Sequence, residues 1–311
     1  MTFFFVVVHT QFLNVCEVTS AISGGDPRDR GNRQPIPATY AFCGAATRTE
    51  ENPLETVDSR TLPVYSAGAV EVPFVIAGMD ELVSRETRWE AHSHPTHELL
   101  WNERGASSAT VGSRTWTITP TVGLWMPAGV LHSAIAPAGT WYRAAQLDIA
   151  SVPSLSDVPV AIEVTPLLRN LLERLADESL GPPSRSLTEQ MVIDVLAPSP
   201  NELLVLVPDS PLLQPIVDAI GDDPSDMRTL SDWARLLGVS PRTITRVFRS
   251  ETGMSFGQWV SAVRAQRAVT LLAHGLDLQE VAERVGYHST SAFGAAFRRT
   301  TGATPGMFRA S

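Results

Sequence analysis

The segment TLSDWARLLGVSPRTITRVFRSETG, Thr229 to Gly253, is followed by a second segment of the same pattern, DLQEVAERVGYHSTSAFGAAFRRTTG, Asp277 to Gly302. Their offset is 48 residues at the start and 49 at the end, because the second copy contains one additional residue. The matched apolar and glycine positions are Leu230/Leu278, Ala234/Ala282, Gly238/Gly286, Phe248/Phe297 and Gly253/Gly302. Each copy predicts two short helices separated by a glycine turn. A tandem pair of helix-turn-helix units makes DNA the first partner to consider.

Local signals predict where the helices of this region begin. Thr229 and Asp232 have the spacing of a capping box, in which each side chain satisfies a backbone N–H of the other. Ser240 followed by Pro241 is a helix cap with proline in the first helical position. Between the two units, residues Phe256–Ala273 predict one long connecting helix.

The second helix of the first unit has the composition of a recognition helix. If it begins at Pro241, Ile244 and Phe248 lie on the face that packs into the core. The residues on the opposite face are Arg242, Thr243, Thr245, Arg246 and Arg249. Arginine reads guanine through paired hydrogen bonds in the major groove, and threonine reaches base edges or phosphates. The alternative interpretation is an arginine-rich face that is merely solvated.

The corresponding helix of the second unit offers less chemistry for reading bases. Its exposed positions are His288, Ser289, Thr290 and Ser291, followed by Gly294 and Ala295. Arg298 and Arg299 come near the helix end, where phosphate is the better partner. We therefore expect the second unit to contribute more to positioning than to the choice of sequence.

Residues 227–311 resemble the AraC/XylS-type DNA-binding domain. The spacing of GVSPRTITRVF and GYHSTSAFGAAFRR is similar to that of the family, as is the final segment GATPGMFR, Gly302 to Arg309. The resemblance implies two units that enter successive major grooves of double-stranded promoter DNA. The departure is Gly294-Ala295, where many family members carry a polar or basic pair. It bears on base reading by the second unit, not on the fold.

The distribution of charge agrees with this resemblance. The chain has a net charge of −9, which is unusual for a DNA-binding protein. Residues 1–226 contain 13 Arg against 28 acids, whereas residues 227–311 contain 11 Arg against 5 acids. The tandem repeat is therefore basic, and the acidic excess lies outside it.

Two further features predict a cytoplasmic protein without a membrane partner. Cys16 and Cys43 are the only cysteines, which excludes a disulfide framework. The apolar run Phe3–Val8 is too short to span a bilayer, and no basic residue precedes it as in a secretory signal.

Composition divides the rest of the chain into four segments. Residues 1–60 lack periodicity and are rich in Gly, Pro, Arg and acids, which predicts a disordered extension. Short β-type runs over residues 61–155 predict a small antiparallel barrel or jelly roll. Residues 156–197 predict two helices, and residues 198–211, with four prolines, predict a linker to the helical domain at 212–311. The fold class is therefore α+β, with a β barrel followed by an all-α domain.

The first of these two helices contains a leucine stripe. Its members are Leu167, Leu168, Leu171, Leu172 and Leu175. Such a stripe is typical of a helix that packs into the core, and it is also suited to pairing with a second chain. For assembly, we predict a homodimer through this helical segment.

A histidine cluster lies in the predicted barrel. His92 and His94 are two residues apart, so on a strand they point to the same side. Glu98 follows, and His132 lies on a later strand. Three imidazoles and a carboxylate suit iron, manganese, zinc, nickel or copper. The alternative for this segment is a metal-free ligand pocket.

The spacing HxHxxxE…PxGxxH resembles the cupin family, a jelly roll that holds a metal. The resemblance carries the metal ligands onto His92, His94, Glu98 and His132. It is incomplete, because Glu86, Thr121 and Ala136 stand where the family motifs have Gly, Gly and Asn. For His97 we expect a packing or surface role. Core packing is also the expected role of most of Trp89, Trp101, Trp116 and Trp125.

Three classes of function compete. The leading hypothesis is a transcription regulator whose barrel senses a small molecule or a metal such as iron. The alternative is a metal-dependent cupin enzyme, an oxygenase or isomerase, with a DNA-binding tail; it leaves the tandem repeat unexplained. A purely architectural DNA-binding protein would leave the barrel unexplained.

Overall fold

The computed structural model describes residues 47–48, 57–200 and 202–309 of the chain. Of the predicted disordered extension, residues 1–46 and 49–56 lie outside the described residues. The end of that segment is ordered, because Val57–Thr61 forms strand β2 and pairs with β4. The ordered domain therefore begins earlier than residue 61.

The N-terminal domain consists of two β-sheets. In the described residues, one sheet has the strand order β1-β2-β4-β9-β6-β7-β12, and the other has the order β11-β8-β5-β10-β3. The strands that precede the first helix are β1 (Thr47–Arg48), β2 (Val57–Thr61), β3 (Ile76–Leu82), β4 (Glu86–His92), β5 (His97–Arg104), β6 (Ser107–Val111), β7 (Arg114–Ile118), β8 (Val122–Met126), β9 (His132–Ala136), β10 (Trp141–Leu147) and β11 (Val160–Glu163).

The predicted fold class is confirmed, with a correction to the barrel. The two sheets face each other but do not close into one continuous sheet. Named strands pair antiparallel except β2 with β4, which run parallel. Part of the space between the sheets is filled by Ala109, Trp116, Ile118, Leu124 and Met126. The rest of it holds a pocket.

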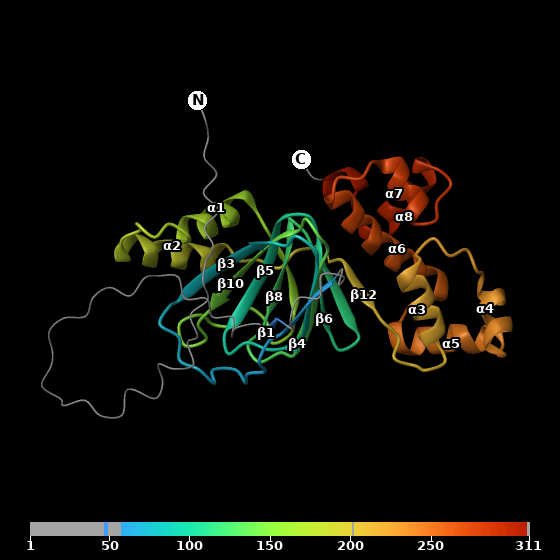
Figure 1. Ribbon diagram of the computed structural model, residues 1–311, viewed down its shortest axis with the longest axis horizontal. Helices are drawn as coiled ribbons and strands as arrows, with labels where there is room; N and C mark the ends of the chain where they lie inside the picture. Colours follow the sequence, from blue (N-terminus) through green and yellow to red (C-terminus); the bar gives the residue numbers. More distant parts are fainter. Residues whose placement is uncertain (1–46, 49–56, 201, 310–311) are drawn as a thin grey trace, which may run out of the picture.

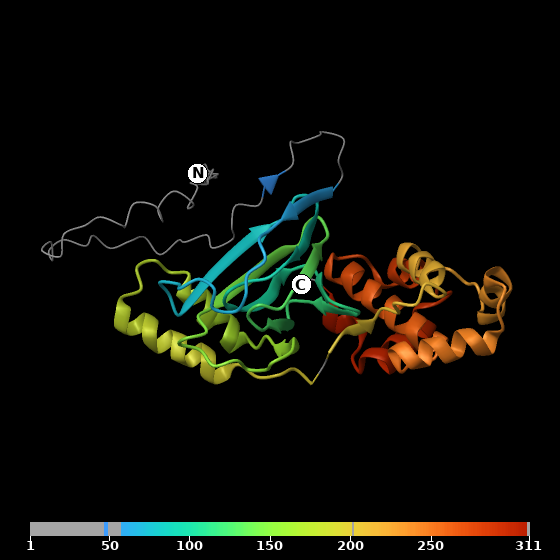
Figure 2. The ribbon, with the colours of Figure 1, turned by 90° about the horizontal axis from the view of Figure 1, so that it is seen from below.

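Two helices cover the outer face of the five-stranded sheet, α1 (Pro166–Leu175) and α2 (Pro182–Val195). Figures 1 and 2 show them on the side of the sheets opposite the C-terminal helices α3–α8. The leucines buried against this sheet are Leu168, Leu171, Leu172 and Leu175. The prediction that this stripe pairs two chains is therefore wrong, because the side chains already fill the core of their own domain. Only Leu167 of the stripe is exposed.

The helical domain contains two units joined by one long helix. Its helices are α3 (Gln214–Asp222), α4 (Leu230–Leu237), α5 (Pro241–Thr252), α6 (Phe256–Ala273), α7 (Leu278–Arg284), α8 (Thr290–Thr301) and the short 3₁₀ helix η2 (Pro305–Phe308). Helix α6 has the bounds that the sequence predicts. The capping box of Thr229 and Asp232 is formed, and Ser240 caps α5 with Pro241 at its first position. Left-handed Gly238 ends α4, as the turn requires.

The segment predicted as a linker contains strand β12 (Leu204–Leu206). This strand extends the seven-stranded sheet, with Leu204 opposite Trp116 and Leu206 opposite Arg114 of β7. On its other side, Val205 is buried in the core of the first helix-turn-helix unit. The connection between the domains is therefore a structural element that both domains share.

Candidate DNA-binding surface and sensor pocket

Helix α5 presents its arginines to solvent. Ile244 and Phe248 are fully buried beneath it, so the helix is fixed in the orientation that the sequence predicts. Arg242, Arg246 and Arg249 are exposed on the other side. Among the described residues none of these three arginines has an ion-pair partner, so their guanidinium groups are available to a ligand.

The two threonines of this face are half-buried and already bonded. The Thr243 N–H donates to Ser240 Oγ over 3.1 Å, and the two hydroxyls lie 2.9 Å apart. The Thr245 hydroxyl donates to the carbonyl of Pro241 over 3.0 Å. Thr245 therefore offers an acceptor, not a donor, and the arginines are the main candidates for reading bases.

Helix α8 presents a smaller and less charged surface. Ser289 caps the helix by accepting from the Ala292 N–H, so its hydroxyl oxygen already has a structural role. His288, Ser291 and Arg298 are exposed, and Thr290 is half-buried. Arg299 points elsewhere: it lines a cleft between α6, the end of α8 and the β12 segment.

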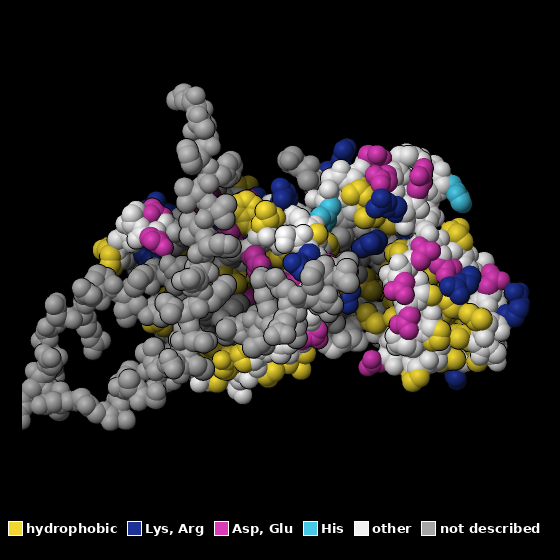
Figure 3. Space-filling view, viewed as in Figure 1, with side chains coloured by type: hydrophobic (Ala, Val, Ile, Leu, Met, Phe, Trp, Pro, Cys, Tyr) yellow, Lys and Arg dark blue, Asp and Glu magenta, His cyan; other side chains and the backbone are white. Residues whose placement is uncertain are grey.

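On one face of the helical domain, positive and negative side chains are mixed. On the face drawn in Figure 3, dark-blue arginines and magenta acids are interspersed over this domain. The candidate for sequence reading is the exposed side of α5, which carries Arg242, Arg246 and Arg249.

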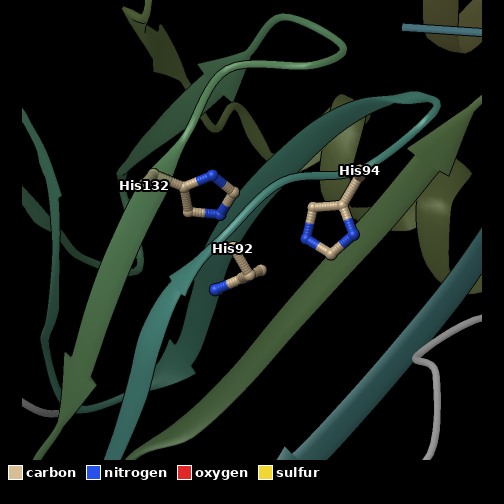
Figure 4. Close-up of side chains that lie close together, drawn as sticks. All are labelled: His92, His94 and His132. Carbon is tan, nitrogen blue, oxygen red and sulfur yellow. The ribbon is translucent and has the colours of Figure 1, made fainter. Parts of the chain in front are cut away.

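The pocket between the two sheets contains the histidine cluster. Its cavity volume is about 50 Å³, and the empty space rises to about 540 Å³ only when the opening to solvent is counted. His92 ends β4, His94 lies in the segment after it, and His132 begins β9. One nitrogen from each ring can be chosen so that all three lie within 4.8 Å of one another. Figure 4 shows the three rings grouped together, although β4 ends before His94.

Burial keeps these imidazoles neutral. It lowers the pKa of His92 and of His94 to about 4, and it also lowers the pKa of His132. His92 Nδ1 lies 2.6 Å from the carbonyl of Glu90, and His132 Nδ1 lies 3.0 Å from that of Val130. In neutral rings these Nδ1–H groups donate, which leaves both Nε2 lone pairs free for a metal.

Glu98 lies beside two of the three histidines, His94 and His132. Its carboxylate oxygens are 3.5 Å from His94 Nε2 and 3.5 Å from His132 Nε2. Gln146 donates to Glu98 Oε1 over 2.7 Å, and Thr96 donates to Gln146 in turn. Burial raises the pKa of Glu98. His94 Nε2 and Glu98 Oε2 are both buried, and neither has a hydrogen-bond partner among the residues that the structure describes.

Gln146 was not predicted as part of the site. It lies 48 residues beyond Glu98, and no sequence motif marks it. By contrast, His97 has the packing role that we expected, because its Nδ1 accepts from the Ala128 N–H and its ring stacks on Trp125. Trp89 lines the pocket, whereas Trp125 is fully buried in the helix-covered core.

Comparison with known proteins agrees with this two-domain organisation. A family model described as a helix-turn-helix domain matches residues 233–311, and one described as an AraC-like ligand binding domain matches residues 84–196. The HTH-type transcriptional regulator NimR of Escherichia coli is 31% identical over 240 residues, which cover 75% of this chain and 84% of NimR. The chain belongs to the AraC family of transcription regulators.

Two further similarities each cover about a third of this AraC-family regulator. RipA of Corynebacterium glutamicum is 41% identical over 107 residues, which cover 33% of this chain and 32% of RipA. The DNA-binding domain of AdpA, solved in complex with a target DNA, is 31% identical; the match covers 32% of this chain and 91% of that one, with a TM-score of 0.30.

The family assigns general roles to the two halves. The helical domain of this AraC-family regulator binds DNA, and its β-sheet domain, hereafter the sensor domain, is a ligand-binding domain. In the described part of the chain, no helix has the length and hydropathy that crossing a bilayer requires.

Proposed function

We propose that this regulator senses a transition metal, or a small molecule that coordinates one, between the sheets of its sensor domain. The observation that carries the proposal is the group of three buried, neutral imidazoles, His92, His94 and His132, in the pocket. Buried polar groups are costly without partners, and the free His94 Nε2 and Glu98 Oε2 fit an ion that would satisfy both.

The residues present fit a divalent metal in chemistry as well as position. His92, His94 and His132 would hold it, with Glu98 as a fourth ligand; iron, manganese, zinc, nickel and copper all accept this donor set. A bound ion would supply positive charge beside Glu98 and an open coordination position for an effector. The rest of the wall is mainly apolar, with Leu100 and Met79 among its members.

For DNA, we propose a division of labour between the recognition helices. Helix α5 selects sequence through Arg242 and Arg246, with Thr243, Thr245 and Arg249 beside them. Helix α8 positions the domain through His288, Ser289, Thr290, Ser291 and Arg298, whereas Arg299 lines the cleft beside β12 and is left out of this surface. This proposal is supported by the free, exposed guanidinium groups of α5 and by the scarcity of charge at the start of α8.

Metal analysis of the purified protein tests the sensing proposal. After dialysis, the wild type should retain about one metal per chain, and His94→Ala should retain far less. His97→Ala is the matched control, because His97 belongs to the same segment but bonds to Ala128 instead of facing the cluster. Equally low metal in the wild type and in His94→Ala would leave a metal-free ligand pocket.

A DNA footprint with and without the retained metal tests the regulatory part. We expect protection of promoter DNA upstream of the gene to change in extent or affinity when the metal is removed. An unchanged footprint across a complete metal titration would show that metal in the pocket does not affect DNA binding.

The same cluster favours one alternative, a metal-dependent cupin oxygenase or isomerase. Three histidines, a carboxylate and an open pocket would serve such an enzyme equally well. Turnover assays with iron-loaded protein distinguish the two, since a sensor binds its ligand without consuming it.

For assembly, we propose a homodimer through the outward face of α1 and α2. This face carries Leu167, Leu187 and Met191, which are 50%, 60% and 41% exposed. Sedimentation of the wild type and of a Leu167→Glu/Leu187→Glu variant tests it. A wild type that sediments as a monomer at micromolar concentration while binding its operator would exclude the dimer.

A further inference from the structure

One turn of the sensor domain is embedded in the second helix-turn-helix unit. Ala106, between β5 and β6, has no exposed surface and packs in the same apolar cluster as Phe293 and Phe297 of α8. Beside it, Thr140 Oγ1 lies 3.1 Å from Nε2 of His274, the residue that ends α6. Thr140 is fully buried as well. The second unit therefore completes its core with a residue of the other domain.

Gly105 makes this close approach possible. Its φ of +80° lies in the left-handed region that favours glycine. A Cβ there would lie 3.1 Å from His274 Nε2 and 3.1 Å from the Cα of Thr140. Gly139, in the neighbouring loop, has almost the same φ of +83°, but a Cβ there would meet nothing within 4 Å. The two glycines thus share backbone strain and differ in their contact with the helical domain.

The strands that lead to this turn come from the histidine cluster. Strand β5 carries Glu98 near its start and ends next to Gly105. Strand β9 begins with His132, and the loop after it ends at Thr140. Strand β10 begins directly after Thr140 and carries Gln146, which holds Glu98. At about 3.3 Å per residue, the cluster and the turn lie at opposite ends of β5, roughly 20–25 Å apart.

We propose that the β5–β6 turn, with Thr140, is a docking surface for the second helix-turn-helix unit, and that the occupant of the pocket controls this docking. The control half of the proposal rests on the metal site proposed above. An ion that draws His132 and Glu98 together acts on β9, which pairs with β4 in one sheet, and on β5, which pairs with β10 in the other. The ion shifts the docking equilibrium only if it binds more tightly to one of the two arrangements.

Hydrogen exchange in metal-free protein tests the docking surface. Gly105→Ala should raise exchange in residues 270–276 at least tenfold, because the new Cβ separates His274 from Thr140. Gly139→Ala should leave that segment as in the wild type, since it adds the same strain without the contact. Thr140→Val removes the hydroxyl and keeps the shape of the side chain, so it should also raise exchange in residues 270–276. If Gly105→Ala does not fold, Thr140→Val serves as the interface variant. Unchanged exchange in both interface variants would overturn the docking surface.

Zinc affinity, measured by competition with a chromophoric chelator, tests the control. Coupling between two sites is reciprocal, so a change at the docking surface must alter zinc binding as much as zinc alters docking. We expect Gly105→Ala to change the zinc Kd at least fivefold and Gly139→Ala less than twofold. Gly105→Ala could raise hydrogen exchange at residues 270–276 and still have a zinc Kd within twofold of the wild type. That result would overturn control of docking by the pocket, while the docking surface itself would stand.

A wild type that binds no zinc would overturn metal sensing and the control with it. The exchange comparison would still decide the docking surface, because it needs no metal. Failure of the proposed function and failure of the docking surface are therefore distinguishable.

Discussion

The two helix-turn-helix units have the same fold and different surroundings. The first unit shows three exposed arginines on α5 and completes its core with Val205 of the connecting strand. The second shows mainly small side chains on α8 and completes its core with Ala106 of the sensor domain. The two units therefore share a fold and differ in their surface residues and in the elements packed against them. These differences favour DNA reading by the first unit and connection to the sensor domain by the second.

The largest expected effect compares the two cores. Phe248→Ala and Phe297→Ala each remove a fully or almost fully buried ring and should cost about 3–5 kcal/mol of unfolding free energy. Urea unfolding measures that cost. If the second unit is the connected one, only Phe297→Ala should also raise hydrogen exchange at residues 104–106. Equal exchange there in both variants would remove the distinction between the units.

The next effect concerns base reading by the first unit. Arg246→Ala should lose about 1–3 kcal/mol of binding to the cognate duplex, because a bidentate contact to guanine is of that size. Arg242→Ala should behave similarly. Titration of cognate and scrambled duplexes measures the loss. If Arg246→Ala weakens both duplexes equally, the residue contacts phosphate, and the first unit does not select sequence.

The second unit should respond differently to loss of its arginine. Arg298→Ala should weaken binding to all duplexes alike and make the dependence of log K on log salt less steep by about one, because one phosphate contact is lost. Arg299→Ala is the matched control, since Arg299 lines the cleft beside β12. A loss in Arg298→Ala that is confined to the cognate duplex would assign base reading to α8.

The smallest effect compares the helix starts of the two units. Thr229 caps α4 in a reciprocal box with Asp232, whereas Asp277 caps α7 by accepting from the Glu280 N–H. Either change to Ala should cost about 1 kcal/mol, and Thr229→Ala should cost the more of the two because it breaks two bonds. Thermal unfolding of the two variants decides the order; a larger loss in Asp277→Ala would contradict it.

The helical domain was largely predictable from the sequence because its signals are local. Caps, turn glycines and the 3.6-residue period lie within a few residues of the structure they determine. Helix α6 accordingly has the predicted bounds, and Ile244 and Phe248 are buried as expected. The histidine cluster was partly local too, since His92 and His94 are neighbours whose rings lie 5.0 Å apart.

What the sequence did not reveal depends on pairings between distant residues. The bond between Gln146 and Glu98 spans 48 positions, and the contact of His274 with Thr140 spans 134. The leucine period of α1 showed that one face is covered but not by what, so the sequence alone left the core of its own domain and a second chain as alternatives. Strand β12 was not predicted for the same reason, because its three residues form a strand by pairing with the distant β7.

Strand β12 also determines how far the two halves can be exchanged between proteins. A cut after Leu206 would separate Trp259 of α6 from the carbonyl that its indole N–H reaches over 2.7 Å, and it would remove Val205 from the first unit. A cut before Leu204 would leave β7 as an open sheet edge, which invites aggregation. Recombination at this junction, in evolution or in a laboratory chimera, must therefore carry the strand with one half and supply a matching edge in the other.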